Sequence, residues 1–176
     1  MNTALISRLL PLLLAACAST PPAAPQPELP AALQPGRDEA HALTVAAAGV
    51  QIYECRAGQN GTAPQWAFVA PEARLFDAKG VPVGSHGAGP HWTAADGSRV
   101  VGSVKARADA PRGDTIPWLL LATTASGPQG RFSGVTSIQR VDTTGGQAPK
   151  AGCDAGAVGR QARIPYTADY RLFRRS

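Results

Sequence analysis

The chain has 176 residues, with 17 lysine and arginine residues against 12 aspartate and glutamate residues, and a formal net charge of +5. The part after residue 40 is long enough for one domain with a real hydrophobic core. The three histidines exclude a copper site of the kind that needs four, and the three cysteines are an odd number for an exported protein.

The first segment has the pattern of a bacterial lipoprotein signal. An apolar run, Leu9–Leu14, leads directly into Ala15, Ala16 and Cys17. The run is far shorter than the roughly 20 residues of a membrane-spanning helix, and small residues before a cysteine are what the signal peptidase needs. The sequence therefore predicts a signal peptide over residues 1–16 and a lipid attached to Cys17. Since Ala18 replaces the aspartate that usually retains lipoproteins in the inner membrane, we expect anchoring in the outer membrane.

A tether is expected to follow the anchor. Prolines recur among alanines from residue 19 to residue 36, a composition that favours extended polyproline conformation over a packed core. We therefore assign residues 17–44 to the lipid-bearing cysteine and a disordered tether, and residues 45–176 to the folded domain. Nucleic acid is not an expected partner of an exported protein, whereas membrane lipid is.

The folded part has the pattern of an all-β domain. Apolar and polar residues alternate over short runs, and glycine or proline recurs about every ten residues. Strands are predicted at residues 43–48, 50–56, 65–69, 73–76, 99–107, 116–124, 130–141 and 163–172. These strands indicate one antiparallel β-barrel or β-sandwich with long loops, and the pattern does not distinguish the two.

Two of the predicted strands are informative about burial. In the last one, the even-numbered residues from Ile164 to Leu172 are apolar or small and most of their neighbours are polar, so one face should be buried. Residues 116–122 are apolar on both faces, which predicts a strand that is buried on both sides, with Pro117 at its entry.

One glycine-rich segment, residues 84–92, holds two of the histidines and is expected to form an irregular loop. His86, His91, Trp92 and the nearby Asp96 are the candidate ligand-binding residues. A divalent metal held by His86 and His91 is the alternative, although no third ligand is evident. No nucleophile elbow, phosphate loop, dinucleotide fingerprint or H-E-x-x-H motif is present, so the sequence predicts no catalytic residue and no cofactor.

The cysteines predict a disulfide bond. If Cys17 carries lipid, Cys55 and Cys153 remain as a pair in an oxidising compartment. A bond across roughly 100 residues would stabilise the fold by about 4 to 5 kcal/mol in the chain-entropy model. A redox-active or metal-binding thiol is the alternative, but no C-x-x-C motif supports it.

Several segments together resemble a known family. They are Gly49-Val50-Gln51-Ile52-Tyr53-Glu54-Cys55, Trp66 with Pro71-Glu72-Ala73, His86 to Trp92, Asp96-Gly97-Ser98, Ile138-Gln139-Arg140, Thr144-Gly145-Gly146, Cys153 and Tyr166 to Tyr170. This succession resembles the bacterial and fungal family called domain of unknown function 3455 over nearly all of residues 45–173. The resemblance implies a secreted or surface-associated protein with no established activity.

The leading hypothesis is an envelope lipoprotein whose β domain binds a small apolar molecule, a glycan or an envelope protein near His86 and Trp92. The alternatives are a metal-dependent enzyme or metal-binding protein that uses His86 and His91, and a purely structural component of the envelope.

Overall fold

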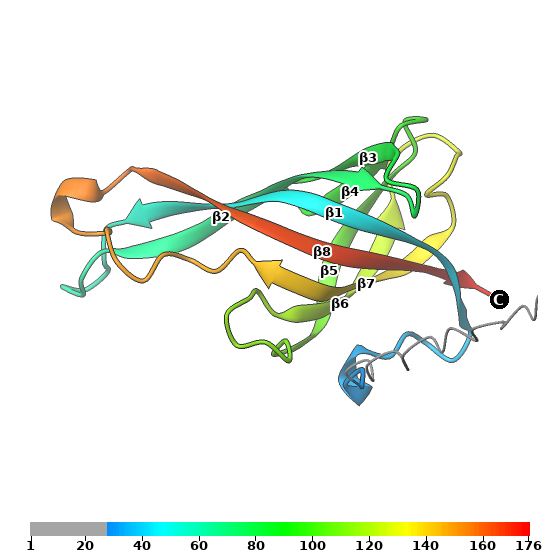
Figure 1. Cartoon of the computed structure of the whole chain (residues 1–176), viewed down its shortest axis with the longest axis horizontal. Coiled ribbons are helices and arrows are strands. Elements are labelled where there is room, and N and C mark those ends of the chain that lie inside the picture. The colour runs from blue at the N-terminus through cyan, green and yellow to red at the C-terminus, as the bar shows by residue number, and fades with distance from the viewer. Residues whose placement is uncertain (1–27) are drawn as a thin grey trace, which may run out of the picture.

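The computed structural model describes residues 28–176, so the predicted signal peptide and Cys17 lie outside the described residues. Eight strands follow one another: β1 (Glu39–Arg56), β2 (Gln65–Phe76), β3 (Pro82–Gly87), β4 (His91–Ala94), β5 (Arg99–Ala108), β6 (Trp118–Ala125), β7 (Val135–Gly145) and β8 (Gln161–Arg175). Each strand is antiparallel to its neighbours, and β1 pairs with β8, so the sheet closes into a barrel (Figure 1). The all-β prediction is confirmed, and of its two architectures the barrel is correct.

Two short 3-10 helices accompany the strands: η1 (Ala31–Leu33) before β1 and η2 (Ala155–Ala157) before β8. In residues 28–176 no helix has both the length and the apolar character that crossing a membrane requires.

The barrel interior is built by the period-two pattern of the strands. On β8, Tyr166, Ala168, Tyr170 and Leu172 are buried, while residues between them are exposed or only partly buried. This confirms the half-buried strand that the sequence predicts. The same core receives side chains from the other strands, among them Val45, Leu75, Trp92, Val100, Leu121 and Ile138.

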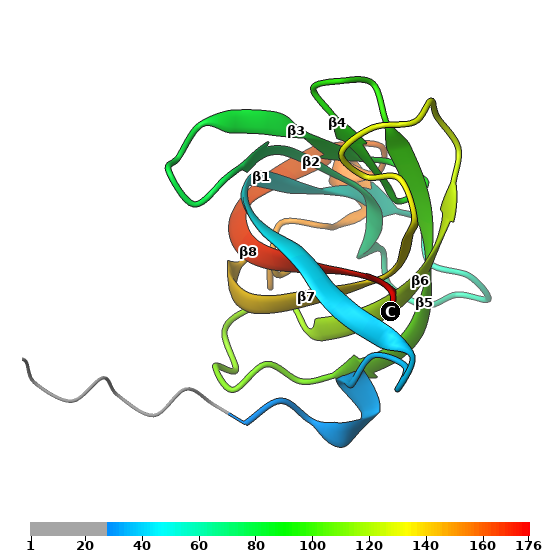
Figure 2. The same cartoon turned by 90° about the vertical axis from the view of Figure 1, so that its right-hand side faces the viewer.

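The strand β6 is buried on both faces, as its sequence predicts. Leu121 belongs to the barrel interior, whereas Trp118 and Leu120 pack outside it against Val141 and Leu33. Leu33 lies in η1, which rests against the β5 and β6 side of the barrel (Figure 2). The N-terminal segment therefore covers the second apolar face of β6.

The predicted tether is consequently too long. Leu33 is fully buried, and β1 begins at Glu39 rather than near residue 45. The error arose because prolines and alanines dominate the composition, although two leucines, Leu29 and Leu33, are enough to dock the segment on the barrel. The folded domain begins before residue 34.

Two long strands replace four short predicted ones. Gly49 separates two predicted strands but lies inside β1, where a Cβ atom would stand only 2.5 Å from the Cα of Ala73 on β2. This glycine permits a close approach of the two strands and does not end either of them. Beyond the barrel, β1 and β2 continue with the start of β8 as a projecting arm (Figure 1).

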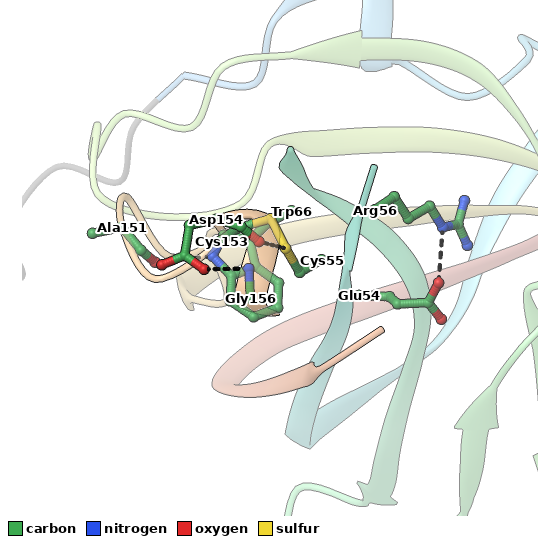
Figure 3. The surroundings of a disulfide bond; sticks show 8 residues. All are labelled: Glu54, Cys55, Arg56, Trp66, Ala151, Cys153, Asp154 and Gly156. Carbon is green, nitrogen blue, oxygen red and sulfur yellow. Dashed lines mark hydrogen bonds and ion pairs between the residues drawn. A yellow bond between two sulfur atoms is a disulfide. The ribbon is translucent and has the colours of Figure 1, made fainter. Parts of the chain in front are cut away.

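The predicted disulfide is present at the end of this arm. Cys55, near the end of β1, is bonded to Cys153, which precedes η2 (Figure 3). Close by, the indole N–H of Trp66 donates to the carbonyl oxygen of Ala151 at 2.9 Å, so this half-buried tryptophan holds the arm rather than the barrel core. The disulfide thus fixes the connection between β7 and β8 to the arm.

Candidate functional site

The segment that was predicted to be an irregular loop is a short hairpin. The strands β3 and β4 pair from Gly84 opposite Ala94 to Gly87 opposite His91, and only residues 88–90 form the turn. The glycines misled the prediction, since a Cβ atom at Gly84 would lie 2.2 Å from the carbonyl oxygen of Thr93. In this register His86 lies directly opposite Trp92, so both side chains occupy the same face of the sheet.

Because this hairpin is short, it leaves part of the barrel wall open. The pairing of β2 with β3 covers only residues 73–76 of β2, and the pairing of β4 with β5 covers only residues 99–101 of β5. Residues 65–71 of β2 and 103–108 of β5 therefore have no strand beside them on the hairpin side. We call the space between these two stretches the wall opening.

A small pocket of about 70 Å³ lies at the wall opening. Exposed apolar side chains form its rim: Phe68 on β2 is 52% exposed and Val104 on β5 is 58% exposed. The pocket is further lined by Pro71, His86, Pro90, Trp92, Leu119, Leu121, Arg140 and Tyr170. The lining is mostly apolar with a few polar groups, which is the usual composition of a small-molecule site.

The imidazole of His86 is held rigidly in this lining. It stacks on the indole of Trp92 with ring centroids 4.3 Å apart, and it meets the ring of Tyr170 edge-on at 5.0 Å. Its Nδ1 donates to the carbonyl oxygen of His91 at 2.8 Å. Burial lowers the pKa of His86 to about 4, so the ring is neutral at physiological pH. Since Nδ1 carries the proton, Nε2 is an acceptor.

The indole of Trp92 has an unused donor. The side chain is 1% exposed, and its Nε1 has no hydrogen-bond partner among residues 28–176. Buried donors in native proteins are nearly always paired with protein or with ordered water. Because Trp92 lines the pocket, an acceptor brought by a ligand or a water molecule is the natural partner for this N–H.

A comparison with protein families identifies the whole domain. The model of a family described as protein of unknown function (DUF3455) matches residues 35–174, from just before β1 almost to the end of β8. This chain belongs to that family. The resemblance that the sequence motifs indicated is confirmed, and no curated protein matches the chain. The family description assigns no activity to this DUF3455 domain.

The pocket of the DUF3455 barrel also contains an arginine that was not among the residues predicted from the sequence. Arg140 lies on β7 between Leu119 of β6 and Tyr170 of β8. Its Nε and Nη2 donate to the carbonyl oxygen of Pro117 at 3.2 and 2.8 Å. One signal was available, because Arg140 is two residues from the buried Ile138 and therefore shares its inward face.

The other two candidate residues have local roles. The ring of His91 is bonded to the carbonyl oxygen of Ala88 at 2.7 Å, within the β3–β4 turn. Asp96 lies in the β4–β5 turn, where it accepts hydrogen bonds from Ser98 and from the backbone N–H of Arg131. These bonds, the Ser98 hydroxyl first, lower the pKa of Asp96. Neither residue lines the pocket, and the hydrogen bonds of Asp96 do not include a histidine.

The structure adds no third ligand to the hypothetical metal site. Within residues 28–176, no three histidine, cysteine, aspartate or glutamate side chains come together. His86 and His91 each use Nδ1 on a backbone carbonyl, which leaves one nitrogen on each ring. Zinc sites in proteins need three or four protein ligands, so the metal hypothesis stays a prediction without structural support.

A larger and more polar cleft of about 590 Å³ lies beside the segment between β5 and β6. Its lining includes Tyr53, Arg107, Arg112 and Gln147. The hydroxyl of Tyr53 donates to the carbonyl oxygen of Gly146 at 2.6 Å, and Arg112 is paired with Asp114. Tyr53 and Arg112 thus have partners within the protein, and among the described residues that line the cleft there is no buried unpartnered donor comparable with Trp92.

Proposed function

We propose that this protein is an envelope lipoprotein whose barrel binds a small, largely apolar molecule at the wall opening. The observation that carries the proposal is a pocket lined by Trp92, whose buried indole N–H has no partner, with Phe68 and Val104 exposed at its rim. The lipid anchor in the outer membrane rests on the sequence around Cys17.

The rim supports binding of apolar surface. Phe68 and Val104 come from strands on opposite sides of the wall opening and leave about half of their surface in water. Apolar ligand atoms between them would remove that surface from water, which contributes about 25 cal/mol for each Å² of apolar surface buried. A rim of this kind therefore suits a hydrocarbon chain or an aromatic ring.

The floor supports recognition of one polar end. Trp92 offers an N–H donor, and His86, whose Nδ1 is bonded to the carbonyl oxygen of His91, supports its indole from one face. The stacking of His86, Trp92 and Tyr170 holds these groups in place before a ligand arrives, which lowers the entropy cost of binding. The pocket is small, so we expect only the polar end of the ligand to enter it.

The test is an NMR titration of the ¹⁵N-labelled domain with four probes: benzamide, hexanamide, benzoate and hexanoate. We expect at least one probe to shift the indole N–H resonance of Trp92, assigned with a Trp92→Phe variant, in a saturable way. Val104→Asn should weaken this binding by about tenfold, because it replaces apolar rim surface by an amide.

The matched control is Val81→Asn, which changes an equally exposed valine outside the pocket and should leave the affinity unchanged. The proposal is wrong if no probe shifts the Trp92 resonance, or if both asparagine variants bind as the parent does. In that case the metal-binding hypothesis and the structural role in the envelope would be the next to test.

A further inference from the structure

We infer that the ligand of this pocket is a carboxylate, with its anionic group on Arg140 and its apolar part between Phe68 and Val104. This inference rests on the proposed function and adds the charge and the head group of the ligand.

The first observation is that Arg140 has no counterion. Arg140 is half-buried and lines the pocket, and none of the ion pairs among the described residues includes it. The nearest acidic residue along β7, Asp142, is paired with Arg171 at 2.9 Å. Removing a cation from water is costly unless an anion or several acceptors compensate for it. The partners of the guanidinium are the carbonyl oxygen of Pro117 and the hydroxyl of Tyr170, and neither of them is an anion.

The second observation is that no side chain in the pocket carries a negative charge. No aspartate or glutamate lines it. The low pKa of His86 keeps its ring neutral, and burial raises the pKa of Tyr170 despite the opposing charge of Arg140, so that phenol stays protonated. The pocket therefore carries a single uncompensated positive charge.

The third observation concerns hydrogen-bond donors. Arg140 and Trp92, whose buried indole N–H has no partner, both line the pocket of about 70 Å³. A carboxylate brings two acceptor oxygens in one plane, and the guanidinium fork matches this geometry better than it matches a neutral amide or hydroxyl. One small planar anion would therefore compensate the charge of Arg140 and supply an acceptor for Trp92.

The experiment compares matched pairs of probes that differ in charge and little in shape: benzoate with benzamide, and hexanoate with hexanamide. We expect the wild-type domain at pH 7.5 and low salt to bind each carboxylate at least about tenfold more tightly than its amide, as charge-assisted hydrogen bonds imply. Increasing the salt concentration should reduce this preference.

Two variants of Arg140 connect the preference to this residue. Arg140→Gln should reduce the ratio of carboxylate to amide affinity to about one, while Arg140→Lys should keep part of it because the charge remains. The control is Arg160→Gln, which removes an exposed arginine of the η2–β8 connection, outside the pocket and the wall opening, and should keep the wild-type ratio. Backbone amide spectra show whether each variant retains the fold.

The outcomes separate the two proposals. If the wild-type domain binds an amide as tightly as its carboxylate, the inference about charge is overturned and the proposed binding function stands. If carboxylates are preferred equally in Arg160→Gln and Arg140→Gln, the charge is recognised elsewhere and the assignment to Arg140 is overturned. If no probe reaches the Trp92 pocket, both proposals fail.

Discussion

The imidazole of His86 is held in place by its contacts and kept neutral by burial. Its Nδ1 bonds to the backbone of the same hairpin, its ring stacks on Trp92, and burial lowers its pKa from the usual 6.5 to about 4. An imidazole in this state is a neutral structural and acceptor group. It would have to be exposed to water or moved beside an anion before it could act as a cation.

The low pKa predicts a stability change at mildly acidic pH. The unfolded chain binds a proton at this histidine near pH 6.5, whereas the folded chain does so only near pH 4. Unfolding therefore takes up a proton between these values, so the free energy of unfolding is fully retained above pH 6.5 and falls as the pH decreases toward 4. The full shift corresponds to about 3 kcal/mol. Urea denaturation at pH 7.5 and at pH 4.5 measures the loss.

A His86→Phe variant should lose most of this pH dependence, because phenylalanine keeps a ring on Trp92 and does not titrate. His41→Gln, which changes an exposed histidine, should retain the parent's behaviour. Equal pH dependence in His86→Phe and the parent would show that the imidazole is not the group that titrates.

At the residue scale, the sequence predicted two of the ten residues that line the pocket. His86 and Trp92 were recognised because they lie close together in the chain within an unusual glycine-rich segment. Tyr170 and Arg140 were not, since they come from β8 and β7 and reach the pocket only when the barrel closes. Asp96 was included because it is near in sequence, but the β4–β5 turn carries it away.

At the scale of elements, the segment around η1 is the main difference between the expected and the observed structure. Leu33 packs on Trp118, Leu120 and Val141, and its carbonyl oxygen accepts a hydrogen bond from Nε2 of Gln139 at 2.7 Å. A barrel has one interior, so a strand that is apolar on both faces needs a cover outside it. Because β6 is apolar on both faces, its sequence predicts that another segment packs on its outer face. The sequence of β6 does not show which segment this is.

This arrangement predicts that a residue of the supposed tether stabilises the barrel. Leu33→Ala should lower the free energy of unfolding by about 2 to 4 kcal/mol, the usual cost of truncating a fully buried leucine. Gln34→Ala, one residue further and exposed, should have no measurable effect. If both variants unfold at the same urea concentration as the parent, η1 does not dock on the barrel in solution.

The hairpin of β3 and β4 illustrates why strands were missed where glycine is frequent. Glycine weakens the alternation of apolar and polar side chains, and its usual role in turns suggested a loop. In the barrel, Gly84 and Gly87 instead allow a neighbouring backbone or the His91 ring to come within 3 Å of where a side chain would begin. The requirement for glycine comes from contacts across the sheet, which a single sequence does not contain.

At the scale of the whole molecule, the pairing of β1 with β8 decides between a barrel and a sandwich. It runs from Glu39 opposite Arg175 to Glu54 opposite Gln161 and joins the two ends of the domain. The same alternating strands would serve either architecture, so the choice depends on this one long-range contact. Past the barrel, the paired strands extend as the arm whose end carries the disulfide (Figure 1).

Because the disulfide lies outside the pocket, its removal should lower the stability of the fold and leave the pocket unchanged. Cys55 and Cys153 are 98 residues apart in the chain, so replacing both by serine should lower the free energy of unfolding by about 4 to 5 kcal/mol. In a domain of this size the melting temperature should fall by roughly 10 °C or more. The bond lies at the end of the arm and not among the pocket residues, so the Trp92 indole resonance of the folded double variant should keep its wild-type position.

A reducing agent provides the control, because it should destabilise the parent to the same extent and leave the double variant unaffected. An unchanged melting temperature in the variant would mean that the arm and the connection between β7 and β8 are held by their other contacts, such as the bond from Trp66 to Ala151. A displaced Trp92 resonance would mean that the arm and the wall opening are mechanically coupled. The arm would then control the shape of the pocket, since β2 contributes both to the arm and, through Phe68, to the rim.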